Sequence, residues 1–187
     1  MTILDLVLVP NPILRQTCET VTSFDSVLHV LLDDMYETMI HHNGVGLAAP
    51  QIGSTQSITV IDISGEYIQK PVINSTNCSP EEIHLKNNRL ELINPTIELG
   101  PQKASSDEGC LSIPEYRDTI RRSYSITVNA HDRLGQPFSF EAEDFLAFVV
   151  QHEVDHLHGT LFTDHLSRLK KSLFRKWCTK HIGENIF

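Results

Sequence analysis

Two histidines four residues apart, His152 and His156, lie in the hexapeptide Gln-His-Glu-Val-Asp-His at positions 151–156. Because each residue of an α-helix advances about 100°, this spacing places both imidazoles on one face, one turn apart, where they can bind the same cation. Glu153 follows the first histidine and projects beside that cation, which suits a general base that is not a ligand. The hexapeptide therefore predicts metal-assisted hydrolysis.

A catalytic metal site normally has three protein ligands and an open position, so the third ligand determines the class of site. A histidine ten residues after the first would indicate one group of metalloproteases, but that position is Phe162. The only later glutamate is Glu184, three residues from the end, where a ligand would be poorly held. Upstream, Cys110 follows a glycine and offers a soft ligand. We therefore predict Cys110, His152 and His156 as the metal ligands.

Three segments, in this order, resemble the signature motifs of the peptide deformylases. They are Gly-Val-Gly-Leu-Ala-Ala-Pro-Gln at 44–51, Glu-Gly-Cys-Leu-Ser at 108–112 and the hexapeptide at 151–156. Residues 9–15, Val-Pro-Asn-Pro-Ile-Leu-Arg, are also similar to that family. The resemblance implies an enzyme that removes the formyl group from the N-terminal formylmethionine of new polypeptides and releases formate. Its partners would be N-formylmethionyl nascent peptides.

The resemblance also implies the cofactor and the catalytic roles. The three predicted ligands would hold one divalent metal ion, Fe²⁺ in the cell, although zinc, nickel or cobalt suits the same ligands in purified protein. Glu153 would take a proton from water and pass it to the leaving amine. The side chain of Gln51 and the backbone N–H of Leu111 would stabilise the oxyanion.

Residues expected to contact the substrate lie in several segments. Residues 44–53 are rich in glycine and are predicted to form a tight loop, in which Val45 and Gly46 would lie against the bound peptide. Arg117 matches a position where the family often has an arginine near the peptide, although a solvated surface arginine explains it equally well.

An apolar pocket beside the metal is predicted from helical spacing. Phe145, Phe148 and Val149 precede His152 by seven, four and three residues, so they lie on the ligand face, where a methionine side chain would fit. Plain core packing explains the same three residues equally well.

Hydrophobic periodicity predicts the elements that position these residues. Residues 24–42 are expected to form a helix with Ser23 or Asp25 as its cap, and residues 57–63 and 90–94 are expected to form strands. A short strand is expected within 94–101, and then a hairpin of residues 125–130 and 137–142 that supports a Cys110 loop. The polar stretch 65–88, with Cys78 and His84, is expected to be a long hairpin or surface loop without an assigned role.

The hexapeptide helix should begin near Asp144 and end near Gly159. Its run Phe-Leu-Ala-Phe-Val-Val at 145–150 is apolar on all sides, which predicts a buried helix. We therefore expect an α+β fold in which mostly antiparallel sheets pack around a central metal-binding helix.

Residues 166–180 are predicted to form a basic C-terminal helix. Leu166, Leu169, Leu173 and Trp177 recur on one stripe, and the other faces carry Arg168, Lys170, Lys171, Arg175, Lys176 and Lys180. A solvated amphipathic helix is one interpretation. The other is a helix that docks on ribosomal RNA, which the substrate implied by the resemblance favours.

Composition limits the remaining possibilities. The 187 residues suit one catalytic domain over 1–187, and a formal net charge of -9 argues against a general nucleic-acid binder. No apolar run reaches the length of a membrane span, and no signal peptide is evident. We expect a cytoplasmic, bacterial protein with no membrane or sequence-specific nucleic-acid partner. An endopeptidase and a structural metal site remain open alternatives.

Overall fold

The computed structural model describes residues 2–65, 73–75 and 88–183. Its larger sheet has six strands in the order β1-β2-β4-β7-β8-β3, and each neighbouring pair is antiparallel. The strands are β1 (Gly46–Ala48), β2 (Ile58–Asp62), β3 (Ile73–Ser75), β4 (Arg89–Leu99), β7 (Ser125–His131) and β8 (Pro137–Glu143). A second sheet pairs β5 (Lys103–Cys110) with β6 (Ile113–Ser123).

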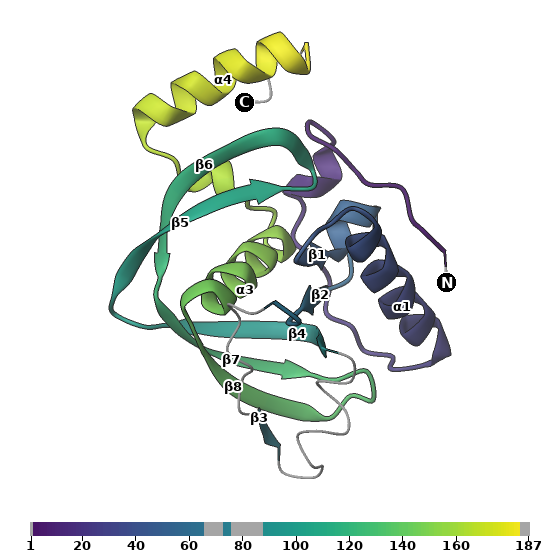
Figure 1. The fold of residues 1–187 in the computed structure, drawn as a ribbon. Helices are drawn as coiled ribbons and strands as arrows, with labels where there is room; N and C mark the ends of the chain where they lie inside the picture. The colour runs from purple at the N-terminus through teal and green to yellow at the C-terminus, as the bar shows by residue number, and fades with distance from the viewer. Residues whose placement is uncertain (1, 66–72, 76–87, 184–187) are drawn as a thin grey trace.

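Within the described residues, three helices accompany the sheets: α1 (Ser26–His41), α3 (Asp144–Leu157) and α4 (Arg168–His181). In Figure 1, α3 lies between the two sheets, α1 lies to one side and α4 lies beyond β6. Short 3-10 turns add η1 (Pro12–Arg15), η2 (Ala49–Ile52) and η4 (Phe162–His165). The expected α+β architecture around a central helix is confirmed. Among the described helices, none combines the length and the hydropathy that crossing a bilayer requires.

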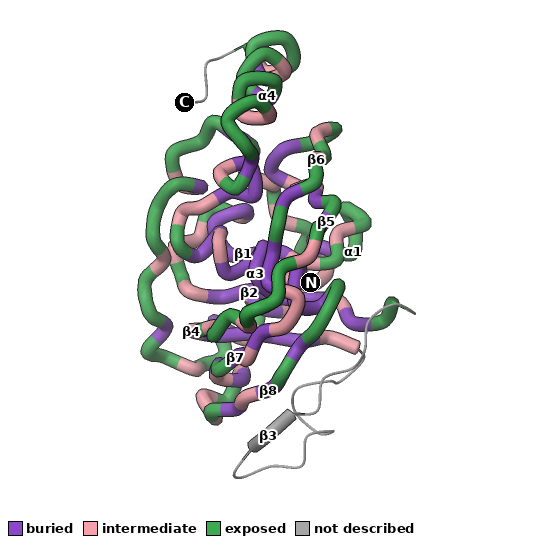
Figure 2. The backbone as a smooth tube through the Cα atoms, turned by 90° about the vertical axis from the view of Figure 1, so that its left-hand side faces the viewer, coloured by how far each residue is buried: buried purple, intermediate pink, exposed green. Residues whose placement is uncertain are grey.

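The central position of α3 follows from its sequence. Leu146, Ala147, Val150 and Val154 pack into a cluster with the inward side chains of β2, β4, β7 and β8. Figure 2 shows the resulting buried centre, with α4 largely exposed at one end. Gly159 follows the helix at φ +68°, and a Cβ there would lie 2.4 Å from the carbonyl oxygen of Arg15. Both facts require glycine at this position, so the predicted end of the helix is confirmed.

In the N-terminal half, the structure agrees in part with the predictions made from the sequence. Asp25 caps α1, since its side chain accepts hydrogen bonds from the backbone N–H groups of Val27 and Leu28. The prediction of a loop throughout 44–53 was wrong, because β1 pairs with β2 and η2 follows it. The separate strand expected after Asn94 is instead the continuation of β4, which passes through an irregularity between Ile93 and Thr96.

Two predictions about support and packing were also wrong. The 125–142 hairpin exists as β7 and β8, but it belongs to the larger sheet, and Cys110 ends β5 in the smaller sheet instead. On α4, Leu169 and Leu173 are 72% and 55% exposed, while Phe174 and Cys178 face the body of the protein. Most of the stretch expected to form a surface loop at 65–88, including Cys78 and His84, lies outside the described residues.

Candidate metal centre

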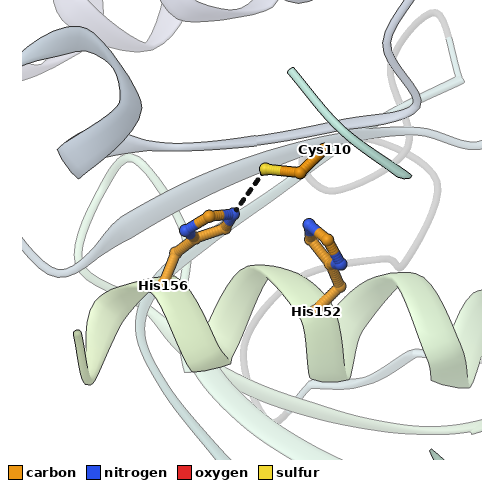
Figure 3. A group of neighbouring side chains, drawn as sticks. All are labelled: Cys110, His152 and His156. Atoms are coloured by element: carbon orange, nitrogen blue, oxygen red, sulfur yellow. Dashed lines mark hydrogen bonds between the residues drawn. The ribbon is translucent and has the colours of Figure 1, made fainter. Parts of the chain in front are cut away.

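The three predicted ligands come together. The ligand atoms of Cys110, His152 and His156 lie within 4.8 Å of one another. Figure 3 shows both imidazoles rising from one face of α3 toward the thiol, which approaches from the end of β5. The Sγ atom of Cys110 is 3.3 Å from Nε2 of His156. Helical spacing on one side and a strand end on the other therefore build one cluster.

The strand end that carries Cys110 is shaped for this approach. β5 and β6 pair regularly from Lys103 to Gly109, and the register shifts between Gly109 and Cys110. A Cβ at Gly109 would lie 3.1 Å from two side-chain atoms of Arg117 on β6, which is a tight contact. The glycine thus lets the two strands pack closely just before the cysteine.

Glu108 orients one of the histidines, a role that sequence reasoning missed. Its Oε2 atom lies 2.9 Å from Nδ1 of His152, so Nε2 is the nitrogen left to face Cys110. Arg122 of β6 donates two hydrogen bonds to the same carboxylate, at 2.9 and 3.0 Å. A carboxylate behind a ligating histidine fixes its tautomer and orientation. The available signal was the position of Glu108, two residues before Cys110.

The electrostatics of the cluster favour a thiolate. Burial opposes ionisation of Cys110, but the adjacent His156 and hydrogen bonds from both histidines outweigh it and lower the pKa of the thiol to about 5. Burial likewise opposes ionisation of Glu108, but His152 and Arg122 lower its pKa to about 2. The site therefore combines a thiolate with two imidazoles.

Glu153 is buried beside the cluster and lies against the backbone of β1. A Cβ on Gly46 would lie only 2.3 Å from Oε1 of Glu153, so glycine at this position makes room for the carboxylate. The Oε2 atom is buried and has no hydrogen-bond partner among the described residues. Burial is the largest cause that raises the pKa of Glu153 to about 7. An unpaired carboxyl group that titrates near neutrality can both accept and donate a proton.

Gln51 also reaches the cluster. Its side chain is buried in η2, and its Oε1 atom accepts a hydrogen bond from the backbone N–H of Ala48 at 2.8 Å. This bond turns the amide Nε2 toward the thiol, 3.4 Å from Sγ of Cys110 and 3.3 Å from Oγ of Ser112. The amide donor is thus held at the edge of the metal centre. Leu111, in the turn after Cys110, lines the pocket that opens beside the cluster.

A pocket of about 720 Å³ opens onto the cluster. Each residue that was predicted to contact the substrate lines it: Val45, Gly46, Arg117, Phe145, Phe148 and Val149. Arg117 is exposed and forms an ion pair with Asp107 at 3.1 Å on the rim. The apolar side chains of α3 therefore face a cavity and not only the core.

The donor set fits a divalent transition metal. One thiolate and two imidazoles suit zinc and its neighbours in the first transition row. Within the described part of the chain, the cluster contains no fourth histidine, cysteine or carboxylate ligand. Three protein donors beside a pocket are typical of a catalytic site, whereas structural sites usually have four. The fold and the site together thus define a metal-dependent hydrolase of the α+β class.

Comparison with known proteins identifies the family. The family model for polypeptide deformylase matches residues 3–172. The chain is 40% identical to peptide deformylase 2 of Vibrio parahaemolyticus over 183 residues, 97% of each chain, and 42% identical to a peptide deformylase of Methylacidiphilum infernorum over 174 residues, 93% of this chain and 90% of that protein. This chain belongs to the polypeptide deformylase family.

Solved structures agree with this assignment. The crystal structure of a peptide deformylase from Legionella pneumophila aligns with a TM-score of 0.80 at 37% identity, covering 96% of this chain and 95% of that one. The enzyme from Ehrlichia chaffeensis in complex with actinonin aligns with a TM-score of 0.81 at 35% identity, covering 96% and 98%. Enzymes of this family are metal-dependent and remove the N-formyl group from nascent polypeptides.

Proposed function

We propose that this chain hydrolyses the formyl group from the N-terminal formylmethionine of newly synthesised polypeptides, releasing formate and a free amine. The observation that carries the proposal is the buried, unpaired carboxylate of Glu153 beside the three metal donors and at the end of an apolar pocket. A structural metal site would have no use for that carboxylate.

The metal would be held by Cys110, His152 and His156, with Fe²⁺ expected in the cell and zinc, nickel or cobalt able to replace it in purified protein. When bound, the ion supplies a Lewis acid that polarises the formyl group and makes water more acidic. Glu108, behind His152, keeps that ligand oriented.

The remaining steps belong to side chains of this chain. Glu153 takes a proton from water as the water oxygen bonds to the formyl carbon. The Nε2 donor of Gln51 and the backbone N–H of Leu111 stabilise the negative charge that develops on the formyl oxygen. Glu153 then passes the proton to the nitrogen as the C–N bond breaks.

The pocket accounts for the substrate. Phe145, Phe148 and Val149 line its apolar part, where the methionine side chain would bind. Val45 and Gly46 border it from the β1 side, and Arg117 borders it from β6, so the following residues of the peptide would lie between them.

The test is formate release from a short N-formylmethionyl peptide by protein loaded anaerobically with Fe²⁺. Glu153→Gln should retain the metal and lose at least a 100-fold factor in rate, because a general acid–base contributes typically 10²–10⁴-fold. Equal rates in the two proteins, or no formate from metallated wild type, would contradict the proposal. Cleavage of an internal bond in an unformylated peptide would instead support the endopeptidase alternative.

We also propose a cytoplasmic enzyme in a bacterium that docks on ribosomal RNA through α4. The helix presents Lys171, Lys176 and Lys180 on an otherwise acidic chain of net charge -9. Replacing these three lysines with glutamate should weaken ribosome binding at low salt while peptide deformylation is unchanged. Unchanged co-sedimentation with ribosomes would contradict the docking role.

A further inference from the structure

A chain of charged side chains leads from the metal centre to the protein surface. It starts at His152, passes to Glu108 and then to Arg122, whose side chain is 4% exposed. From Arg122 it continues to Asp155 of α3 and ends at His165 of η4. Four elements, β5, β6, α3 and η4, thus contribute to one hydrogen-bonded path.

His165 closes this path from outside. Its Nε2 atom is 2.7 Å from Oδ2 of Asp155 and 3.3 Å from Nη1 of Arg122, and its side chain is 37% exposed. Because an ionised carboxylate only accepts hydrogen bonds, the shorter contact requires a proton on Nε2. A proton on Nε2 cannot coexist with acceptance of a bond from Arg122 at the same atom, so the Asp155 bond is the one that His165 makes.

The charges along the path explain why an outer donor is needed. Glu108 and Asp155 are both negative, and the single guanidinium of Arg122 is shared between them. Without His165, Asp155 would draw more strongly on Arg122 and weaken the forked contact that holds Glu108. Glu108 would then hold the His152 imidazole less firmly.

We propose that His165 is a positioning residue for the metal centre, donating from Nε2 to Asp155 and thereby keeping Arg122 on Glu108 and Glu108 on His152. This inference rests on the proposed function, because His152 must be a metal ligand for the path to matter. It assigns a role to a surface histidine that lies outside the three sequence motifs.

The test uses two amides that differ only in reach. In His165→Gln the side-chain amide can place a donor near the position of Nε2, whereas in His165→Asn it reaches only the position of Nδ1. The proteins are loaded with Co²⁺, and the visible absorption spectrum and the rate of metal loss to a chelator are measured. Formate release gives kcat and KM separately, and thermal unfolding verifies folding.

We expect His165→Asn to lose metal about 10-fold faster, since loss of outer-shell partners typically costs 10–100-fold. Its Co²⁺ spectrum should shift and its kcat should fall while KM is unchanged, and His165→Gln should resemble wild type in all these respects. His181→Asn, at an exposed histidine on α4 whose Nδ1 contacts the carbonyl of Trp177, is the matched control and should change nothing.

A double substitution keeps the test decisive if stability changes. In an Asp155→Asn background, Gln and Asn at position 165 should become indistinguishable, because the acceptor they serve has lost its charge. Wild-type spectra and chelation rates in His165→Asn, or equal defects in the Asn and Gln variants, would overturn the inference alone. A wild type that binds no metal would overturn the proposed function and the inference together.

Discussion

At the residue scale, the missing Cβ of Gly46 decides where the Glu153 carboxylate can lie. An alanine Cβ would come within 2.3 Å of Oε1, and within 2.8 Å of Cγ, so the whole side chain would have to move. Glu153 is buried, so the displaced carboxylate could move only toward the pocket that it lines. We expect Gly46→Ala to retain its metal but to lose about 100-fold in kcat, within the range that a general base contributes. Metal analysis and formate release measure both; wild-type kcat would show that the carboxylate position is not critical.

The Gln51 side chain has two roles, as a donor to the oxyanion and as an acceptor from Ala48. Two different measurements on one substitution distinguish them. In Gln51→Ala, loss of the Nε2 donor should raise the reaction barrier by about 3–4 kcal/mol. Loss of Oε1 leaves the buried N–H of Ala48 without its partner, which should lower the free energy of unfolding by about 1–3 kcal/mol. Kinetics report the first effect and urea unfolding the second. A stability loss with unchanged kcat would restrict Gln51 to supporting η2.

At the element scale, strong periodicity or unambiguous turn residues made a segment predictable. The apolar faces of α1 and α3 and the hairpin of β7 and β8 were visible in the sequence for this reason. β5 was missed because Lys103–Cys110, Lys-Ala-Ser-Ser-Asp-Glu-Gly-Cys, contains few strand-forming residues and is held by its long pairing with β6. The face of α4 was misassigned because only Phe174 and Cys178 are buried on it.

The residues of the metal site likewise divide into those that the sequence predicts and those that it does not. The ligands and Glu153 follow from spacing within one helix and from a single motif cysteine, so they could be predicted. The contact of Glu108 with His152 joins residues 44 positions apart through a tertiary arrangement, and Arg122 comes from the neighbouring strand. No local pattern encodes such a contact.

The attachment of α4 supplies a prediction at this scale. Lys170 of the helix donates to Asp118 of β6 and to the carbonyl of Thr119, and the hydroxyl of Tyr116 also donates to Asp118. Burial opposes ionisation of Asp118, but these hydrogen bonds and a backbone N–H outweigh it and lower its pKa below 3.8. Asp118→Asn should therefore lower the free energy of unfolding by about 1 kcal/mol at pH 7, a modest value because Lys170 is 38% exposed.

The pH dependence of the stability difference between wild type and Asp118→Asn follows from the direction of the pKa shift. A carboxyl group whose pKa is lower in the folded protein stabilises the fold at pH values above its unfolded-state pKa. This stabilisation is lost as the pH falls through its folded-state pKa. The gap between wild type and Asp118→Asn should thus persist at neutral pH and narrow below pH 3.8, as measured by chemical unfolding. Asp107→Asn, in an ion pair whose side chains are more than 60% exposed, is the control and should change stability by less than about 0.5 kcal/mol. A gap that is independent of pH would contradict the ion-pair explanation.

At the scale of the whole molecule, the metal centre draws its ligands from both sides of the contact between the smaller sheet and α3. Cys110 belongs to the two-stranded sheet, and both histidines belong to the helix packed on the six-stranded sheet. A bound ion would therefore link the two sheets through α3. Such a link exists only in the folded protein, so metal binding should stabilise the fold.

Removing the metal should consequently lower the melting temperature. At a free metal concentration about 100-fold above Kd, binding adds about 2.7 kcal/mol to the free energy of unfolding. For a chain of this size this corresponds to a rise of roughly 5–10 °C in melting temperature. Wild type treated with a chelator should melt lower by that amount and recover when Fe²⁺ or Ni²⁺ is restored. His156→Ala, which lacks one ligand, should melt at nearly the same temperature with or without chelator. If the melting temperature of the wild type is the same with and without chelator, despite verified metal removal, the protein holds the two sheets together without the ion. The centre would then serve only the reaction.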